Sequence, residues 1–82
     1  MTELLLVMTS LPDEDAAKAL AKRLIDAHLA ACVQIQSGVQ SIYRWEGCVC
    51  EEQEAVLVAK TTGKQWPAIS VFIKQNHPYD LP

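Results

Sequence analysis

Hydrophobic residues follow two different periods along the chain, and these periods predict its first elements. Residues 3–9, ELLLVMT, form a short apolar run that predicts a strand covered on both faces. Apolar residues then recur at helical spacing from about 13 to about 29, after an acidic start where Ser10 or Asp13 can cap the helix. In residues 31–39 hydrophobic and polar side chains alternate again, which predicts a second strand.

The middle of the chain predicts a long β-hairpin. Two β-rich runs flank Glu46-Gly47, the only turn signal between them, and Gly47 supplies a positive φ. With a two-residue turn, side chains that pair across the hairpin share a face. Four side chains then lie on one face: Tyr43, Trp45, Cys48 and Cys50. Residues 55–59, AVLVA, predict that the returning strand is central in the sheet.

A second helix follows the hairpin, with Thr61 or Thr62 as its cap and Pro67 near its start. Its apolar stripe consists of Trp66, Ile69, Phe72 and Ile73. The order β-α-β-β-α gives five elements of the split βαβ, ferredoxin-like pattern. We therefore predict an α+β fold, a ferredoxin-like sandwich in which an antiparallel sheet carries two helices on one face. No repeat or linker divides residues 1–82, so they form a single domain.

A sixth element of this pattern, the strand that pairs beside the first strand, has no counterpart before Pro82. Without that strand, the first strand is an edge with unpaired backbone groups. We expect either that the chain continues or that a partner supplies the pairing.

Composition narrows the possible partners. The chain has 82 residues and is half hydrophobic, and its net charge of −3 argues against a nucleic-acid surface. The first apolar run is too short to span a bilayer, and it lacks the positively charged start of a signal peptide. No basic amphipathic stretch suggests membrane binding. Three cysteines are an odd number, which is typical of free thiols in a reducing compartment. These features predict a cytoplasmic protein.

Cys48 and Cys50 raise the question of a metal site. Their positions are about 7 Å apart along the strand, and two thiolates are only half of a zinc site. The two histidines, His28 and His77, fall on other elements. We therefore interpret the cysteines as small, soft residues beside two aromatic rings. Because a two-stranded arm is marginal in water, we expect this arm to lie against another copy of the chain.

Four segments of the chain, in their order and spacing, resemble the CutA divalent-cation-tolerance family. They are LPDEDAAKALAKRLIDAHLAACVQI, SIYRWEG, KTT and HPYDLP, and together they cover essentially the whole chain. The resemblance implies a ferredoxin-like fold similar to the PII signalling proteins, and a homotrimer in which long hairpins wrap neighbouring subunits. Family members continue past HPY-x-x-P through another strand and a C-terminal helix. By this resemblance, a C-terminal strand and helix are missing from the 82 residues.

The resemblance also implies tolerance of copper and other divalent cations. The family's proposed copper ligands are a cysteine at the end of the first strand and two adjacent histidines before PY. Here Thr9 and Asn76-His77 hold those positions, while Cys32 matches a common family cysteine. One histidine remains, so we expect no firmly bound cofactor and only weak binding of Cu(II) or another divalent metal, through His77.

Other groups are candidates for a cleft between subunits: Tyr43, Trp45, Lys60, Tyr79 and Asp80. Ordinary interface packing is the alternative for these groups. His28 falls on the stripe of the first helix, which predicts a packed, structural side chain. The family carries no defined reaction, so we expect a trimeric metal-tolerance or signalling module and not an enzyme. The alternatives are a scaffold trimer that anchors a partner, and an enzyme or ligand-binding module with an intersubunit site.

Overall fold

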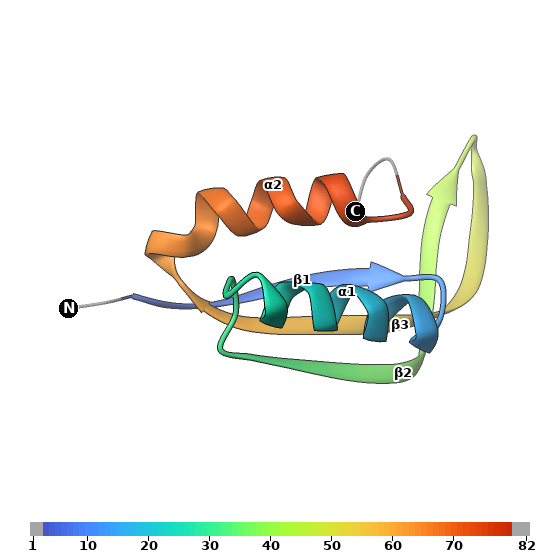
Figure 1. Cartoon of the computed structure of the whole chain (residues 1–82). Coiled ribbons are helices and arrows are strands. Elements are labelled where there is room, and N and C mark those ends of the chain that lie inside the picture. Colours follow the sequence, from blue (N-terminus) through green and yellow to red (C-terminus); the bar gives the residue numbers. More distant parts are fainter. Residues whose placement is uncertain (1–2, 80–82) are drawn as a thin grey trace.

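The computed structural model describes residues 3–79, in which a three-stranded antiparallel sheet carries two helices. In order along the chain, the elements are β1 (Leu4–Leu11), α1 (Glu14–Asp26), β2 (Cys32–Trp45), β3 (Cys48–Thr62), a 3-10 turn (Gly63–Gln65) and α2 (Trp66–Asn76). β3 lies between β1 and β2, and both helices lie on one face of the sheet (Figure 1). The predicted α+β, ferredoxin-like order is confirmed. None of the described helices has the length and apolarity needed to cross a membrane.

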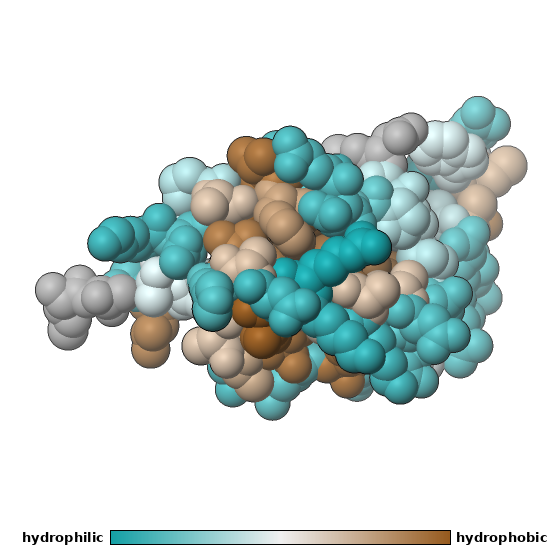
Figure 2. Space-filling view, in the orientation of Figure 1, coloured by the Kyte–Doolittle hydropathy of each residue, from teal (hydrophilic) through white to brown (hydrophobic). Residues whose placement is uncertain are grey.

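The core fills the space between the helices and one face of the sheet. It consists of Leu11, Ala17, Leu20, Leu24, Ala55, Leu57, Ala59, Ile69 and Ile73. Every second residue of β3 from Ala55 to Thr61 is buried here, and the alanines at 55 and 59 leave room for the helices to approach the central strand. Hydrophilic side chains cover much of α1, and apolar ones show between α1 and α2 (Figure 2).

The first helix begins as predicted and ends earlier. Asp13 is its N-cap and accepts a hydrogen bond of 2.8 Å from the Ala16 amide. The helix closes with a Schellman motif, because the His28 N–H donates to Ile25 O and the Leu29 N–H donates to Leu24 O. His28 takes the left-handed position of this motif, with φ of 58°, and its side chain is exposed. The prediction of a packed His28 inside a helix reaching residue 29 is wrong, since the chain has already left the helix there.

The predicted threonine cap of the second helix is also wrong. Thr61 still belongs to β3, faces the core with 6% exposure, and donates a hydrogen bond of 2.7 Å to Leu29 O. Thr62 precedes the 3-10 turn and makes no side-chain capping bond. The helix begins at Trp66 with Pro67 in its first turn, as the sequence predicted.

The hairpin forms an arm that rises from one end of the molecule (Figure 1). Its turn has positive φ at both Glu46 and Gly47, which suits the right-handed twist of the flanking strands. The predicted pairs Trp45–Cys48 and Tyr43–Cys50 are confirmed by the register.

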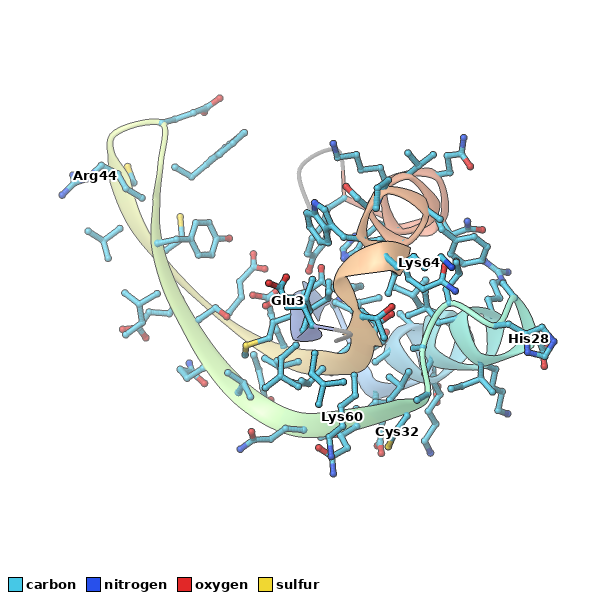
Figure 3. The ribbon with its side chains drawn as sticks, turned by 90° about the vertical axis from the view of Figure 1, so that its left-hand side faces the viewer. Glu3, His28, Cys32, Arg44, Lys60 and Lys64 are labelled. Atoms are coloured by element: carbon cyan, nitrogen blue, oxygen red, sulfur yellow. The ribbon has the colours of Figure 1, made fainter. Side chains whose placement is uncertain are left out.

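A bulge at Gly38 determines how the two faces of the arm join the two faces of the sheet. The register shifts between Gln36 and Val39, and Gly38 has φ of 69°. One extra residue in β2 reverses the alternation of its side chains. The bulge lets Tyr43 and Trp45 lie on the sheet face opposite the helices, while Val33 and Ile35 of the same strand pack against the core. Arg44 lies on the outer side of the arm (Figure 3).

The sheet face opposite the helices is open in the single chain. The β1 side chains Leu4, Leu6 and Met8 are 82%, 67% and 66% exposed. The expectation that both faces of β1 are covered is therefore wrong within one chain. By alternation along β3, this open face continues into the arm face of Cys48 and Cys50.

Candidate functional site

A histidine and a threonine meet where α2 ends beside the last part of β1. Thr9 lies near the end of β1 and is 8% exposed, and His77 directly follows α2. The Nε2 atom of His77 lies 2.9 Å from Thr9 Oγ1. The sequence resemblance implied that the positions of Thr9 and His77 belong together, and the fold brings them into contact.

The second ring nitrogen of His77 is also occupied. The Tyr79 backbone N–H donates to His77 Nδ1 over 3.1 Å, and the two rings lie 5.0 Å apart at 45°. Because Nδ1 accepts, the ring proton belongs on Nε2, which donates toward Thr9. Burial lowers the pKa of His77, while a hydrogen bond to the backbone of Ser10 and the charge of Glu54 act against burial. The ring is therefore neutral at pH 7.

Tyr79 ties the segment after α2 to the base of the arm. Its hydroxyl donates to Glu54 Oε2 over 2.6 Å. Hydrogen bonds from Ser41 and from Tyr79 lower the pKa of Glu54. Burial and the neighbouring Glu54 carboxylate raise the pKa of Tyr79. The phenol thus stays protonated and the carboxylate ionised at neutral pH, which favours this charge-assisted hydrogen bond.

Tyr43 extends the same surface along the arm. A hydrogen bond to Glu52, with a smaller effect of burial, raises the pKa of Tyr43 to about 12. Four side chains from β2, β3 and the segment after α2 make up a phenol–carboxylate cluster: Tyr43, Glu52, Glu54 and Tyr79. Its ionised oxygens suit a cation or a hydrogen-bond donor.

The structure brings together some of the predicted cleft residues and separates others. Tyr43 and Tyr79 belong to the phenol–carboxylate cluster, and Trp45 lies farther out on the same arm face with 64% exposure. Lys60 pairs with Leu6 and Cys32 in the part of β3 away from the arm, so it does not join them (Figure 3). Asp80 lies outside the described residues.

Lys60 lines a separate hollow of about 470 Å³ at that other end of the sheet. Leu4, Leu6, Leu29 and Ala30 also line it, with His28 and Gln65 at its polar side. The hollow combines side chains of the open face with those of the loop after α1. It is therefore a mainly apolar surface, unlike the phenol–carboxylate cluster.

Sequence reasoning missed Glu52 and Glu54. The alternation of β3 places both acids on the face of Cys48 and Cys50, so the predicted hairpin register contained that signal. The contact of Glu54 with Tyr79 depends on where α2 ends relative to the arm, and no local pattern specifies that.

The donors in one chain do not form a closed metal site. Among residues 3–79, no group of three or more His, Cys, Asp or Glu side chains is placed to hold one ion. Both nitrogens of His77 are already hydrogen-bonded, so a metal at Nε2 would displace Thr9. The three cysteines are free. Metal binding through His77 stays a prediction.

Comparisons with known proteins agree on one family. The family model described as CutA1 divalent ion tolerance protein matches residues 5–82. The divalent-cation tolerance protein CutA of Thermus thermophilus is 45% identical over 76 residues, which are 93% of this chain and 74% of the relative. The chloroplastic protein CutA 1 of Oryza sativa is 40% identical over 78 residues, and there the match covers 95% of this chain and only 44% of the relative.

Solved structures give the same result for the fold. The structure of CutA from Synechococcus elongatus superposes with a TM-score of 0.95 at 39% identity, covering 100% of this chain and 72% of that chain. CutA1 from Oryza sativa gives a TM-score of 0.92 at 39% identity, covering 96% of this chain and 73% of that chain.

Proposed function

The chain belongs to the CutA1 divalent ion tolerance family, and we propose that it contributes to divalent-cation tolerance as a cytoplasmic homotrimer. The observation that supports the assembly most strongly is the open sheet face, which continues into the aromatic face of the arm. The role in cation tolerance rests on the names of the relatives, and the cytoplasmic location rests on the free thiols.

Two features of the single chain favour association with copies of itself. Large apolar side chains are exposed along the open face and the arm face that continues it: Leu4, Leu6, Met8, Tyr43 and Trp45. Contiguous apolar surface of this kind marks an interaction site in soluble proteins. In addition, β1 and β2 are both edge strands of the described sheet, and edge strands pair readily with other chains. The family resemblance favours three copies.

The cation side of the proposal rests on the surface around His77 and the phenol–carboxylate cluster. Imidazole suits copper and zinc, and carboxylates add oxygen ligands for divalent ions. Since one chain supplies no group of three suitable ligands among its described residues, we propose weak binding completed by water. Binding through His77 weakens below about pH 6, where imidazole in general becomes protonated.

Light scattering of the full-length protein tests the assembly. At micromolar concentration we expect the mass of three chains, and the mass of one chain would contradict the homotrimer.

Calorimetric titration with Cu(II) and with Zn(II) tests the cation role. We expect His77→Ala to abolish the binding and Cys48→Ser/Cys50→Ser to retain it. The reverse result, in which the serine variant loses all binding while His77→Ala binds like the parent, would show that the divalent site lies at the thiols.

A second candidate function is binding of a small ligand in a cleft between subunits. The ionised carboxylates and protonated phenols of the phenol–carboxylate cluster support it. A thermal-shift screen of small cationic and hydrogen-bonding compounds, repeated with Tyr79→Phe, distinguishes the two. A ligand that stabilises the parent and not the variant favours the cleft. A trimer that responds to neither metal nor ligand favours a scaffold role.

A further inference from the structure

Two thiols of the arm stand one residue apart on the same face of β3. Cys48 is exposed and Cys50 is half-buried, and both are free. The register places Cys48 opposite Trp45 and Cys50 opposite Tyr43, so an aromatic side chain neighbours each thiol. Cys50 Sγ lies 3.9 Å from the carbonyl oxygen of Cys48. This sulfur therefore leans back along the strand toward the other cysteine.

We propose that Cys48 and Cys50 of one arm bind a soft monovalent cation, Cu(I) or Ag(I), between their two sulfurs. Thiolates select soft ions, and two thiolates on opposite sides satisfy a monovalent ion of this class. A structural zinc site needs four ligands, so two thiolates are too few for zinc. The same two thiolates are enough for the soft monovalent ion. The site is additional to the divalent-cation role proposed above, because it uses neither His77 nor an oxygen ligand.

The strand geometry suits an ion better than a disulfide. Residues i and i+2 of a strand are about 7 Å apart, which is too far for an unstrained S–S bond between them. Cys50 already leans toward Cys48, and rotation of Cys48 about χ1 between staggered positions moves its sulfur toward Cys50. The two sulfurs can then face each other, and the proposed ion lies between them.

The charges and protons of the binding step balance. Each thiol releases its proton to solvent, the ion enters in its monovalent state, and no electron is transferred. The acids Glu51 and Glu52 directly follow the pair and attract a cation to the arm. The complex carries one net negative charge, and Arg44 on the opposite face of the arm offsets part of it.

Titration of the reduced, full-length protein with Ag(I), in the absence of oxygen, tests the proposal. Ag(I) does not change oxidation state under these conditions, and Cu(I) competition against a chelator then extends the result to copper. Trp45 reports on the site through its emission, since it pairs directly with Cys48, and Trp45→Phe identifies its share of the signal. The matched control is Cys32→Ser, which removes the exposed thiol of β2 outside the arm.

We expect the parent and Cys32→Ser to bind one ion tightly per chain and to lose Trp45 emission together. Cys48→Ser and Cys50→Ser should each lose at least about 100-fold in affinity, because the second sulfur of a chelate acts at an effective concentration of millimolar or more. Circular dichroism and light scattering establish that the serine variants remain folded and assembled.

Three results would overturn the proposal. Either single variant could keep the affinity of the parent, which means that the thiols act separately. The double variant could bind like the parent, which places the ion elsewhere. The parent could also bind Ag(I) tightly without any change in Trp45 emission, which means that the ion does not lie beside Cys48. None of these results changes what the divalent titrations with His77→Ala are expected to give, so the two proposals can fail independently.

Discussion

Replacing Trp45 by alanine should weaken the assembly and leave the single-chain fold nearly unchanged. Trp45 is 64% exposed in the single chain and lies in the last position of β2, so the fold itself gains little from its burial. A tryptophan buries up to about 250 Å², so roughly 160 Å² remains available for a neighbouring chain. At about 25 cal/mol per Å², covering that area contributes up to about 4 kcal/mol.

Part of this contribution is lost to side-chain ordering, and interface tryptophans commonly account for about 2 kcal/mol or more. Three chains each lose one such contact, so association to the trimer should weaken by about 6 kcal/mol, or roughly four orders of magnitude in the overall constant. Light scattering over a dilution series measures that constant. Thermal unfolding at a concentration where the variant is monomeric measures the fold.

Two control variants sharpen the test. Arg44→Ala changes the neighbouring residue on the other face of the arm and should leave the trimer intact. Trp45→Phe keeps an aromatic ring and should recover most of the affinity. If Trp45→Ala remains a trimer at the lowest measurable concentration, Trp45 is not an interface anchor and the assembly depends on the open face alone.

Two further predictions concern the base of the arm. Tyr79→Phe removes the hydrogen bond that Tyr79 donates to Glu54. Because the pKa of Glu54 is lowered in the folded protein, the ionised carboxylate stabilises the fold above the ordinary pKa of 4.5, and this stabilisation is lost as pH falls through the folded-state pKa. The variant should show a smaller loss of stability between neutral pH and acid than the parent in urea unfolding, and an unchanged acid dependence would mean that the bond contributes nothing. Gly38→Val places a β-branched residue at φ of 69° and should lower stability by about 1–2 kcal/mol, with Gly38→Asn affected less, and equal thermal midpoints for both would contradict the strain argument.

The hairpin shows how far sequence can predict this fold. Glu46-Gly47 was the only turn signal in its region, and a two-residue turn determines every cross-strand pair along the arm. The face shared by Tyr43 and Cys50 followed from that register alone. Helix ends were harder to predict, because His28 closes α1 in a conformation that usually belongs to glycine.

The candidate site was less predictable, since its contacts join segments far apart in the chain. Thr9 and His77 are 68 positions apart, and only the packing of α2 beside β1 places them within a hydrogen bond. Tyr79 and Glu54 are 25 positions apart and meet because the arm bends at its base. The sequence pattern identified both aromatic residues of the cluster but not their acidic partners, which are common on any exposed strand.

Assembly and soft-ion binding are both proposed for the same face of the arm, and this has a thermodynamic consequence. Trp45 is the side chain expected to contact a neighbouring chain, and it pairs directly with the ion ligand Cys48. If the neighbouring chain excludes water from the thiols, it strengthens their hold on the ion. The ion must then stabilise the assembly by the same factor, because coupling between two binding events is reciprocal. The two-residue turn places the aromatic side chains and the thiols on one face, and the bulge at Gly38 joins that face to the open sheet face, so both proposals depend on the same hairpin geometry.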